Sequence, residues 1–311
     1  GEFLMMLLVF WVIWTYQTVL ANRYFNNQLA QSLFTLFNMF WVIVLSTAIN
    51  VDFVKTKWSF QLSTAILFLS VAIQYGLIWR QKHAALPKIF GLTLTIAGAL
   101  ALVSPFLTPY SLSFTVFFLG VVGASFVPLL FWRTINAAPV DFSHLSERYS
   151  LLVLLIFGEA VIGVADTVYS GLSLQAGLFF FVVILLFVAY QLVYDNGLNR
   201  QIKTGGLAAI HLHYPLLAAI LSISTFIHLW LTQELDPRWF AAAITLALAV
   251  YYFSLIGYLR AYPTNKIDIG FKRWFYLGFS LMIFGVYSFM TAAMPLPFML
   301  GLTAYLLANT L

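Results

Sequence analysis

The chain has 311 residues, of which 62% are hydrophobic and only 8% carry a formal charge. Soluble domains carry about 25% charged residues, so this composition excludes a water-soluble fold. The net charge of +5 does not indicate a nucleic-acid partner, because the Lys and Arg residues lie almost entirely in short connections between apolar runs. Cysteine is absent, which excludes disulfides and thiolate chemistry.

Repeated apolar runs of about 20 residues predict an all-α fold, a polytopic bundle of transmembrane helices. The connections are too short for a soluble domain, so residues 1–311 are expected to form a single integral membrane domain. The eleven expected spans are 3–20, 29–50, 59–79, 86–106, 112–132, 144–167, 174–194, 206–232, 238–259, 271–291 and 294–311.

The charges of the connections orient this bundle. Alternate connections, starting from the first, hold Arg23, Arg80, Lys82, Lys88, Arg133, Arg200, Lys203, Arg260, Lys266, Lys272 and Arg273. The other connections hold only Lys55, Lys57 and Arg238. The positive-inside rule therefore places the first set in the cytoplasm. In that orientation the first span begins outside, which suggests that a preceding helix, a twelfth, is missing from the sequence.

The span at 144–167 differs from the others because it is apolar enough to cross a bilayer and yet carries several ionisable residues. At 100° per residue, His144, Arg148, Glu159 and Asp166 fall within about 60° of one another on one stripe of the helix. Glu147 lies off this stripe. A charge that faces lipid at membrane depth costs several kcal/mol. We therefore expect the stripe to face a protein interior or a water-filled cavity.

Glu159 lies past the middle of the membrane, where a carboxylate must be protonated or paired. Arg148 is about 16 Å away along the helix axis and is too far for a direct bond. We therefore predict an ion or proton site at Glu159, with Asp166 at the outer edge of the same stripe. The alternative is a structural pair between Glu159 and a residue of another span.

A second group of polar residues is expected near the cytoplasmic side, where three consecutive spans reach a similar depth. Its members are His144, Glu147, Arg148, Asp195, His211 and His213. They are predicted to contact a substrate or to act as gating groups. The alternatives are that Arg148 extends to a lipid phosphate and that the histidines hydrogen-bond between helices. His211 and His213 point away from each other on a regular helix, so no metal site and no cofactor are predicted.

The span at 144–167 contains the pattern His-x-x-Glu-Arg followed by an apolar stretch and Gly-Glu, formed by His144, Glu147, Arg148, Gly158 and Glu159. Supporting segments are Trp11 through Ala21-Asn22-Arg23-Tyr24-Phe25, Tyr194-Asp195 and His211-Leu-His213-Tyr-Pro215. With these motifs the chain resembles the bacterial low-temperature-requirement A family of membrane proteins over most of its length. It departs from the family at its start, where family members usually have an acidic, Phe-rich first helix.

The resemblance implies a multi-pass protein of the bacterial inner (cytoplasmic) membrane, in a family named for growth in the cold. It supplies no established molecular activity. From the residues we favour a transporter or channel-like protein for an ion or small polar solute, with the lipid bilayer and that solute as partners. One alternative is an intramembrane enzyme acting on lipid or a lipid-linked substrate at the cytoplasmic leaflet. Another is a non-catalytic membrane stress factor or scaffold. The sequence does not indicate the oligomeric state.

Overall fold

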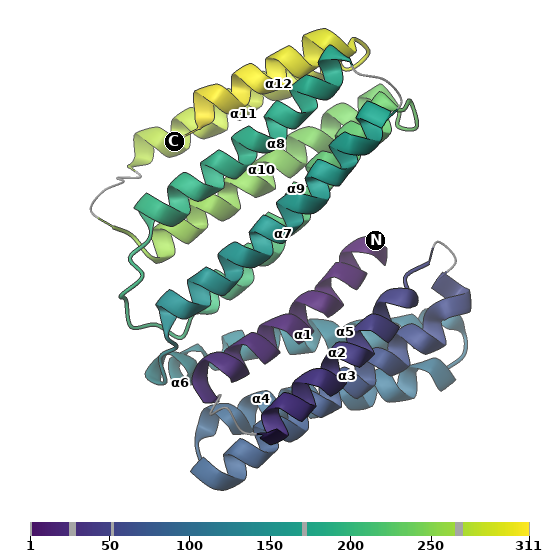
Figure 1. The fold of residues 1–311 in the computed structure, drawn as a ribbon, viewed down its shortest axis with the longest axis vertical. Coiled ribbons are helices and arrows are strands. Elements are labelled where there is room, and N and C mark those ends of the chain that lie inside the picture. The colour runs from purple at the N-terminus through teal and green to yellow at the C-terminus, as the bar shows by residue number, and fades with distance from the viewer. Residues whose placement is uncertain (1, 25–28, 51–52, 170–172, 265–269, 311) are drawn as a thin grey trace. The chain divides into compact units, whose positions relative to one another are not determined.

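The computed structural model describes residues 2–24, 29–50, 53–169, 173–264 and 270–310 (Figure 1). Within these residues the regular structure is helical, which confirms the predicted all-α fold. Lys266, one of the residues that orient the bundle, lies outside the described part. The helices are α1 (Glu2–Tyr24), α2 (Leu29–Thr47), α3 (Phe53–Lys82), α4 (Ala85–Val103), α5 (Tyr110–Leu130), α6 (Trp132–Ala137), α7 (Phe142–Tyr169), α8 (Leu174–Leu192), α9 (Leu207–Leu231), α10 (Pro237–Ala261), α11 (Phe271–Thr291) and α12 (Pro295–Asn309).

In the described part of the chain, 10 helices are long and apolar enough to cross a membrane, and α12 is a shorter apolar helix. Each of the eleven predicted spans corresponds to one of these helices, so the polytopic bundle is confirmed. Three short elements were not expected: α6, a 3₁₀ turn at Ser104–Phe106 and a π-helical turn at Val193–Gly197. Each of them is too short to produce a readable hydrophobic period.

The chain forms two compact units. Unit 1 consists of Gly1–Leu145 and Lys203–Leu207, and unit 2 of Ser146–Ile202 and Ala208–Leu311. The expectation of a single integral membrane domain stays a prediction.

The short segment 203–207 is bound into unit 1 by its main chain. The Val140 N–H donates to the Thr204 carbonyl at 2.9 Å. The Gly205 N–H donates to the Asn136 side-chain oxygen, also at 2.9 Å. This segment follows α8 in the sequence, so unit 1 is completed by residues far from the rest of it along the chain.

The core of unit 1 is built on α3, which packs along α1, α2 and α4, while α5 packs along α1 and α4. Two buried tyrosines join these helices through their hydroxyls. Tyr16 donates to the Ala124 carbonyl at 2.8 Å, and Tyr75 donates to the Tyr16 carbonyl at 2.9 Å. The Phe90 ring lies edge-on to both, with centroids 5.1 and 5.5 Å away. The hydroxyls of Tyr16 and Tyr75 thus each have a partner, as an apolar environment favours.

In unit 2, α12 lies along α8, and α11 packs against both α10 and α12 (Figure 1). The rings of Trp230, Phe240 and Phe298 form one cluster with centroids 4.4 to 4.9 Å apart. The Trp230 indole N–H donates to the Ala292 carbonyl at 2.8 Å. These contacts hold α9, α10 and α12 together.

Candidate functional site: a charged face on α7

One face of α7 is buried against its neighbours. The buried residues on this face include Tyr149, Val153, Phe157, Ala160 and Val164. Within unit 2, Phe157 meets Phe187 of α8 edge-on at 5.3 Å. Near the end of α7, the Thr167 hydroxyl lies 3.2 Å from Nδ1 of His228 on α9. These contacts fix the rotation of α7 about its own axis.

The opposite face of α7 is exposed and carries three of the charges singled out in the sequence. Arg148, Glu159 and Asp166 are all exposed. Among the described residues, none of the three side chains has a hydrogen bond or an ion pair. Helical geometry places Glu159 and Asp166 about 10 Å apart along the axis. Their grouping on one face agrees with the predicted stripe.

Aliphatic residues interrupt this charged face. Leu151, Leu155 and Ile162 lie at similar angles on the helix and are 59%, 66% and 55% exposed. The charges therefore lie at three depths, with Glu159 about 16 Å and Asp166 about 27 Å from Arg148 along the axis. The stripe is a series of polar positions separated by apolar sections.

The start of α7 is fixed by polar contacts within unit 1. The Asp141 carboxylate accepts a hydrogen bond from the His144 main-chain N–H at 3.1 Å and so caps the helix. The Asn22 side chain in turn bonds both main-chain groups of Asp141. The neighbouring Arg23 donates to the Ala138 carbonyl. Two segments identified in the sequence, residues 21–24 and the His144 motif, are thus joined in the structure.

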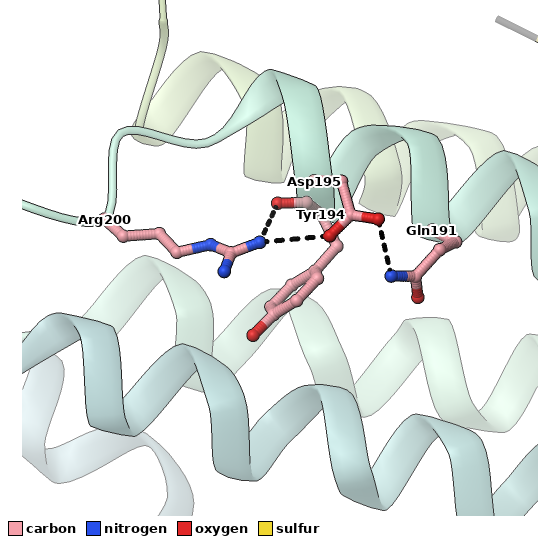
Figure 2. A network of polar contacts seen from close by, with 4 residues as sticks. All are labelled: Gln191, Tyr194, Asp195 and Arg200. Carbon is pink, nitrogen blue, oxygen red and sulfur yellow. Dashed lines mark hydrogen bonds and ion pairs between the residues drawn. The ribbon is translucent and has the colours of Figure 1, made fainter.

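Asp195 lies in the π-helical turn that ends α8, and its carboxylate binds local partners (Figure 2). Gln191 donates to one carboxylate oxygen at 2.7 Å, and Arg200 donates to the other at 3.3 Å. Arg200 also donates to the Tyr194 carbonyl and lies over the Tyr194 ring at 3.9 Å. π-helical turns are frequent at functional sites. In this turn, however, both carboxylate oxygens of Asp195 already bind nearby residues, Gln191 and Arg200.

His213 is buried in unit 2 and only 1% exposed. Its Nδ1 is 2.8 Å from the Ala209 carbonyl, which can only accept, so Nδ1 carries the proton. The rings of Tyr149, Tyr190 and Tyr258 surround it, with centroids at 4.7, 6.3 and 4.6 Å. Its other nitrogen, Nε2, has no hydrogen-bond partner among the described residues. His213 is therefore a core residue in an aromatic cage.

Sequence reasoning missed the tyrosines of this cage. No spacing along the chain signals the cage, because its three tyrosines lie on three different helices. Sequence reasoning also missed the pairing of His228 with Thr167.

The other members of the predicted cytoplasmic group differ from His213 in burial. Glu147 is exposed and His211 is half-buried. The residues that the structure describes contain no group of three or more His, Asp or Glu side chains that could hold a metal ion. The cluster of six residues, taken as a whole, stays a prediction.

The apolar helices of membrane-spanning length define the chain as a multi-pass α-helical membrane protein. It belongs to the bacterial low temperature requirement A protein (LtrA) family, whose sequence profile matches residues 1–310. This match confirms the resemblance seen in the His144–Glu159 motif. No curated protein and no solved structure matches the chain.

Proposed function

We propose that this protein is a transporter or channel for an ion or small polar solute, and that the charged face of α7 lines its route. One observation carries the proposal. Arg148, Glu159 and Asp166 are exposed on a single face of a helix of membrane-spanning length, opposite its packed face. Such charges cost several kcal/mol against lipid, whereas water in a polar route solvates them.

The residues of this face have distinct roles in the proposal. Glu159 is the cation or proton site, and Asp166, about 10 Å further along the helix, is a second one on the same route. Carboxylates are the groups that bind hard cations and carry protons. Arg148 meets anions or gates the route. Leu151 and Leu155 form the apolar section between Arg148 and Glu159. We place the protein in the bacterial inner membrane, with the positively charged connections in the cytoplasm.

An intramembrane enzyme at the cytoplasmic leaflet is the competing idea. It would use His144 as a base, Glu147 or Asp195 to orient that base, and Arg148 to hold a phosphate. The structure gives Asp195 other contacts, because Arg200 and Gln191 bind both of its carboxylate oxygens. This observation favours transport over the version of the enzyme that uses Asp195.

The test compares Glu159→Gln with wild type in proteoliposomes. Flux of H⁺, Na⁺, K⁺ and inorganic phosphate is recorded with an internal pH dye and ion-selective dyes across a range of pH. Glu234→Gln is the matched control, because Glu234 is exposed in the connection between α9 and α10. It makes the same chemical change outside the membrane.

We expect wild type and Glu234→Gln to carry the same flux and Glu159→Gln to lose at least about tenfold, because a Gln amide cannot carry a proton or bind a hard cation as a carboxylate does. A flux that survives Glu159→Gln unchanged at every pH would show that Glu159 is not the ion site. A folded wild-type protein that passes none of the four probes would exclude the proposal for those ions.

A further inference from the structure

A groove runs along the surface of unit 1 between α3 and α4, far in sequence from the charged face of α7. Its volume is about 370 Å³. On α3 the lining residues follow one another at single-turn intervals and include Ala72, Gly76 and Arg80. On α4 they do the same and include Lys88, Gly91 and Thr95. The groove therefore follows both helix axes.

The groove has a charged end and an apolar remainder. Arg80 lies in the last turns of α3 and Lys88 in the first turn of α4, so both cations are at the end next to the α3–α4 connection. From there the groove extends about 12 Å along α3, to Ala72. Ile73, Leu77 and Leu92 line this apolar part.

Gly76 leaves part of the groove open, whereas Gly91 lets α4 lie close to α3, because a Cβ at Gly91 would already contact Tyr75 and Ala72. A Cβ added at Gly76 would meet nothing within 4 Å, because that side of α3 is open space. Trp79 forms part of the wall beside the cations, and the Lys88 ammonium lies 5.4 Å from the centre of its ring. An aromatic ring next to basic residues is typical of the level where a helix passes from lipid tails to headgroups.

The positive charge at this end is not balanced locally. The sequences of α3 and α4 contain no Asp or Glu. Arg80 and Lys88 are both exposed, and within the described residues neither takes part in an ion pair. The groove thus presents two cations above an apolar floor.

We propose that this groove binds one anionic phospholipid, with its phosphate on Arg80 and Lys88 and the upper part of an acyl chain along Gly76 and Gly91. The charged end of the groove matches the phosphate of the lipid, and the apolar part matches its acyl chain. Cations at the membrane surface attract anionic headgroups, and the apolar floor buries hydrocarbon. A free phosphate would use only the charged end.

Native mass spectrometry of protein released from vesicles tests this proposal. The vesicles contain equal amounts of dioleoylphosphatidylglycerol and dioleoylphosphatidylcholine, and the measurement is the ratio of the two lipids that remain bound. The double variant Arg80→Gln/Lys88→Gln removes the charge. Gly76→Phe keeps both cations and fills the apolar part, and Thr95→Trp fills it from α4 if Gly76→Phe does not fold.

The matched control is Lys82→Gln, which removes a cation from the same connection outside the groove. We expect wild type and Lys82→Gln to prefer the anionic lipid to the same extent. Each cation near the membrane surface contributes about 1 kcal/mol of attraction to an anionic lipid. Removing both should therefore reduce the preference for the anionic lipid about thirtyfold. The groove-filling variant should lose lipid retention although its charge is unchanged.

Three results would overturn the proposal. The first is an unchanged lipid ratio in Arg80→Gln/Lys88→Gln, and the second is unchanged retention in the groove-filling variant. The third is displacement of the bound lipid by inorganic phosphate alone, which would define a soluble-anion site instead. The groove contains no residue of α7, so none of these results bears on the proposed transport route.

Discussion

Asn22, in the last turn of α1, and Asp141, directly before α7, exchange two hydrogen bonds. The Asn22 amide donates to the Asp141 carbonyl at 2.9 Å, and the Asp141 N–H donates to the Asn22 side-chain oxygen at 3.0 Å. The Asp141 carboxylate then caps α7 at His144. A side chain near the start of the chain therefore holds the residue that begins the charged helix.

Replacing Asn22 should loosen this junction. We expect Asn22→Ala to lower the free energy of unfolding by about 2 kcal/mol, because two hydrogen bonds are lost. Asn22→Asp keeps the acceptor for the Asp141 N–H and loses the donor, so it should fall between Ala and wild type. The measurement is thermal unfolding in detergent micelles. Equal loss in both variants would mean that only the donated bond contributes.

A buried polar chain in unit 1 gives a second prediction. Ser70 donates to the Asn38 side-chain oxygen at 2.6 Å, and the Asn38 amide donates to Gln17 at 3.2 Å, which joins α1, α2 and α3. Hydrogen bonds between membrane helices contribute about 0.6 kcal/mol on average. A double-mutant cycle with Asn38→Leu and Ser70→Ala should therefore give a coupling of that size. A coupling near zero would show that packing alone places α2.

His213 allows a test of the aromatic cage. His213→Ala should destabilise unit 2 by about 3 kcal/mol, since it leaves a cavity among three tyrosine rings. His213→Phe keeps a ring of similar size and should cost less than about 1.5 kcal/mol. Urea or thermal unfolding of both variants checks this order. A loss of the same size in both variants would show that the hydrogen bond from Nδ1 to the Ala209 carbonyl, which both remove, outweighs the packing of the ring.

Gly206 has a backbone conformation that favours glycine, with φ of 79°. A Cβ at this position would also lie 2.6 Å from the Leu145 side chain. Gly206→Ala should cost about 2 kcal/mol from the left-handed conformation alone. Gly270→Ala is the control, because Gly270 has φ of −66° and open space around it. Melting temperatures of the two variants should differ by several degrees, with Gly206→Ala the lower.

Much of the fold was predictable because it depends on local properties of the sequence. The length of an apolar run sets the length of a helix that crosses the membrane, so the eleven expected spans correspond to helices. The grouping of Arg148, Glu159 and Asp166 on one face was also predictable, since it follows from 100° per residue. Their exposure was not, because the stripe was expected to face a protein interior or a water-filled cavity.

Other features depend on contacts between distant segments, and no local pattern contains them. Asn22 and Asp141 are 119 residues apart in sequence. The cage around His213 takes its tyrosines from α7, α8 and α10, whose packing a single sequence does not specify. Asp195 lies in a π-helical turn, a backbone form without a composition signal, and this turn places its carboxylate between Gln191 and Arg200.

The insertion of residues 203–207 into unit 1 has a consequence for synthesis on the ribosome. Val140 and Asn136 bind their partners Thr204 and Gly205 only after α7 and α8 have been made. Unit 1 can therefore complete its hydrogen bonds only when part of unit 2 has already left the ribosome. A fragment that stops at Leu145 would contain the helices α1–α6 of unit 1. It would still lack residues 203–207, which complete that unit. Because residues 146–202 of unit 2 are synthesised before residues 203–207, unit 1 completes its fold only after all of α7 and α8 have been synthesised.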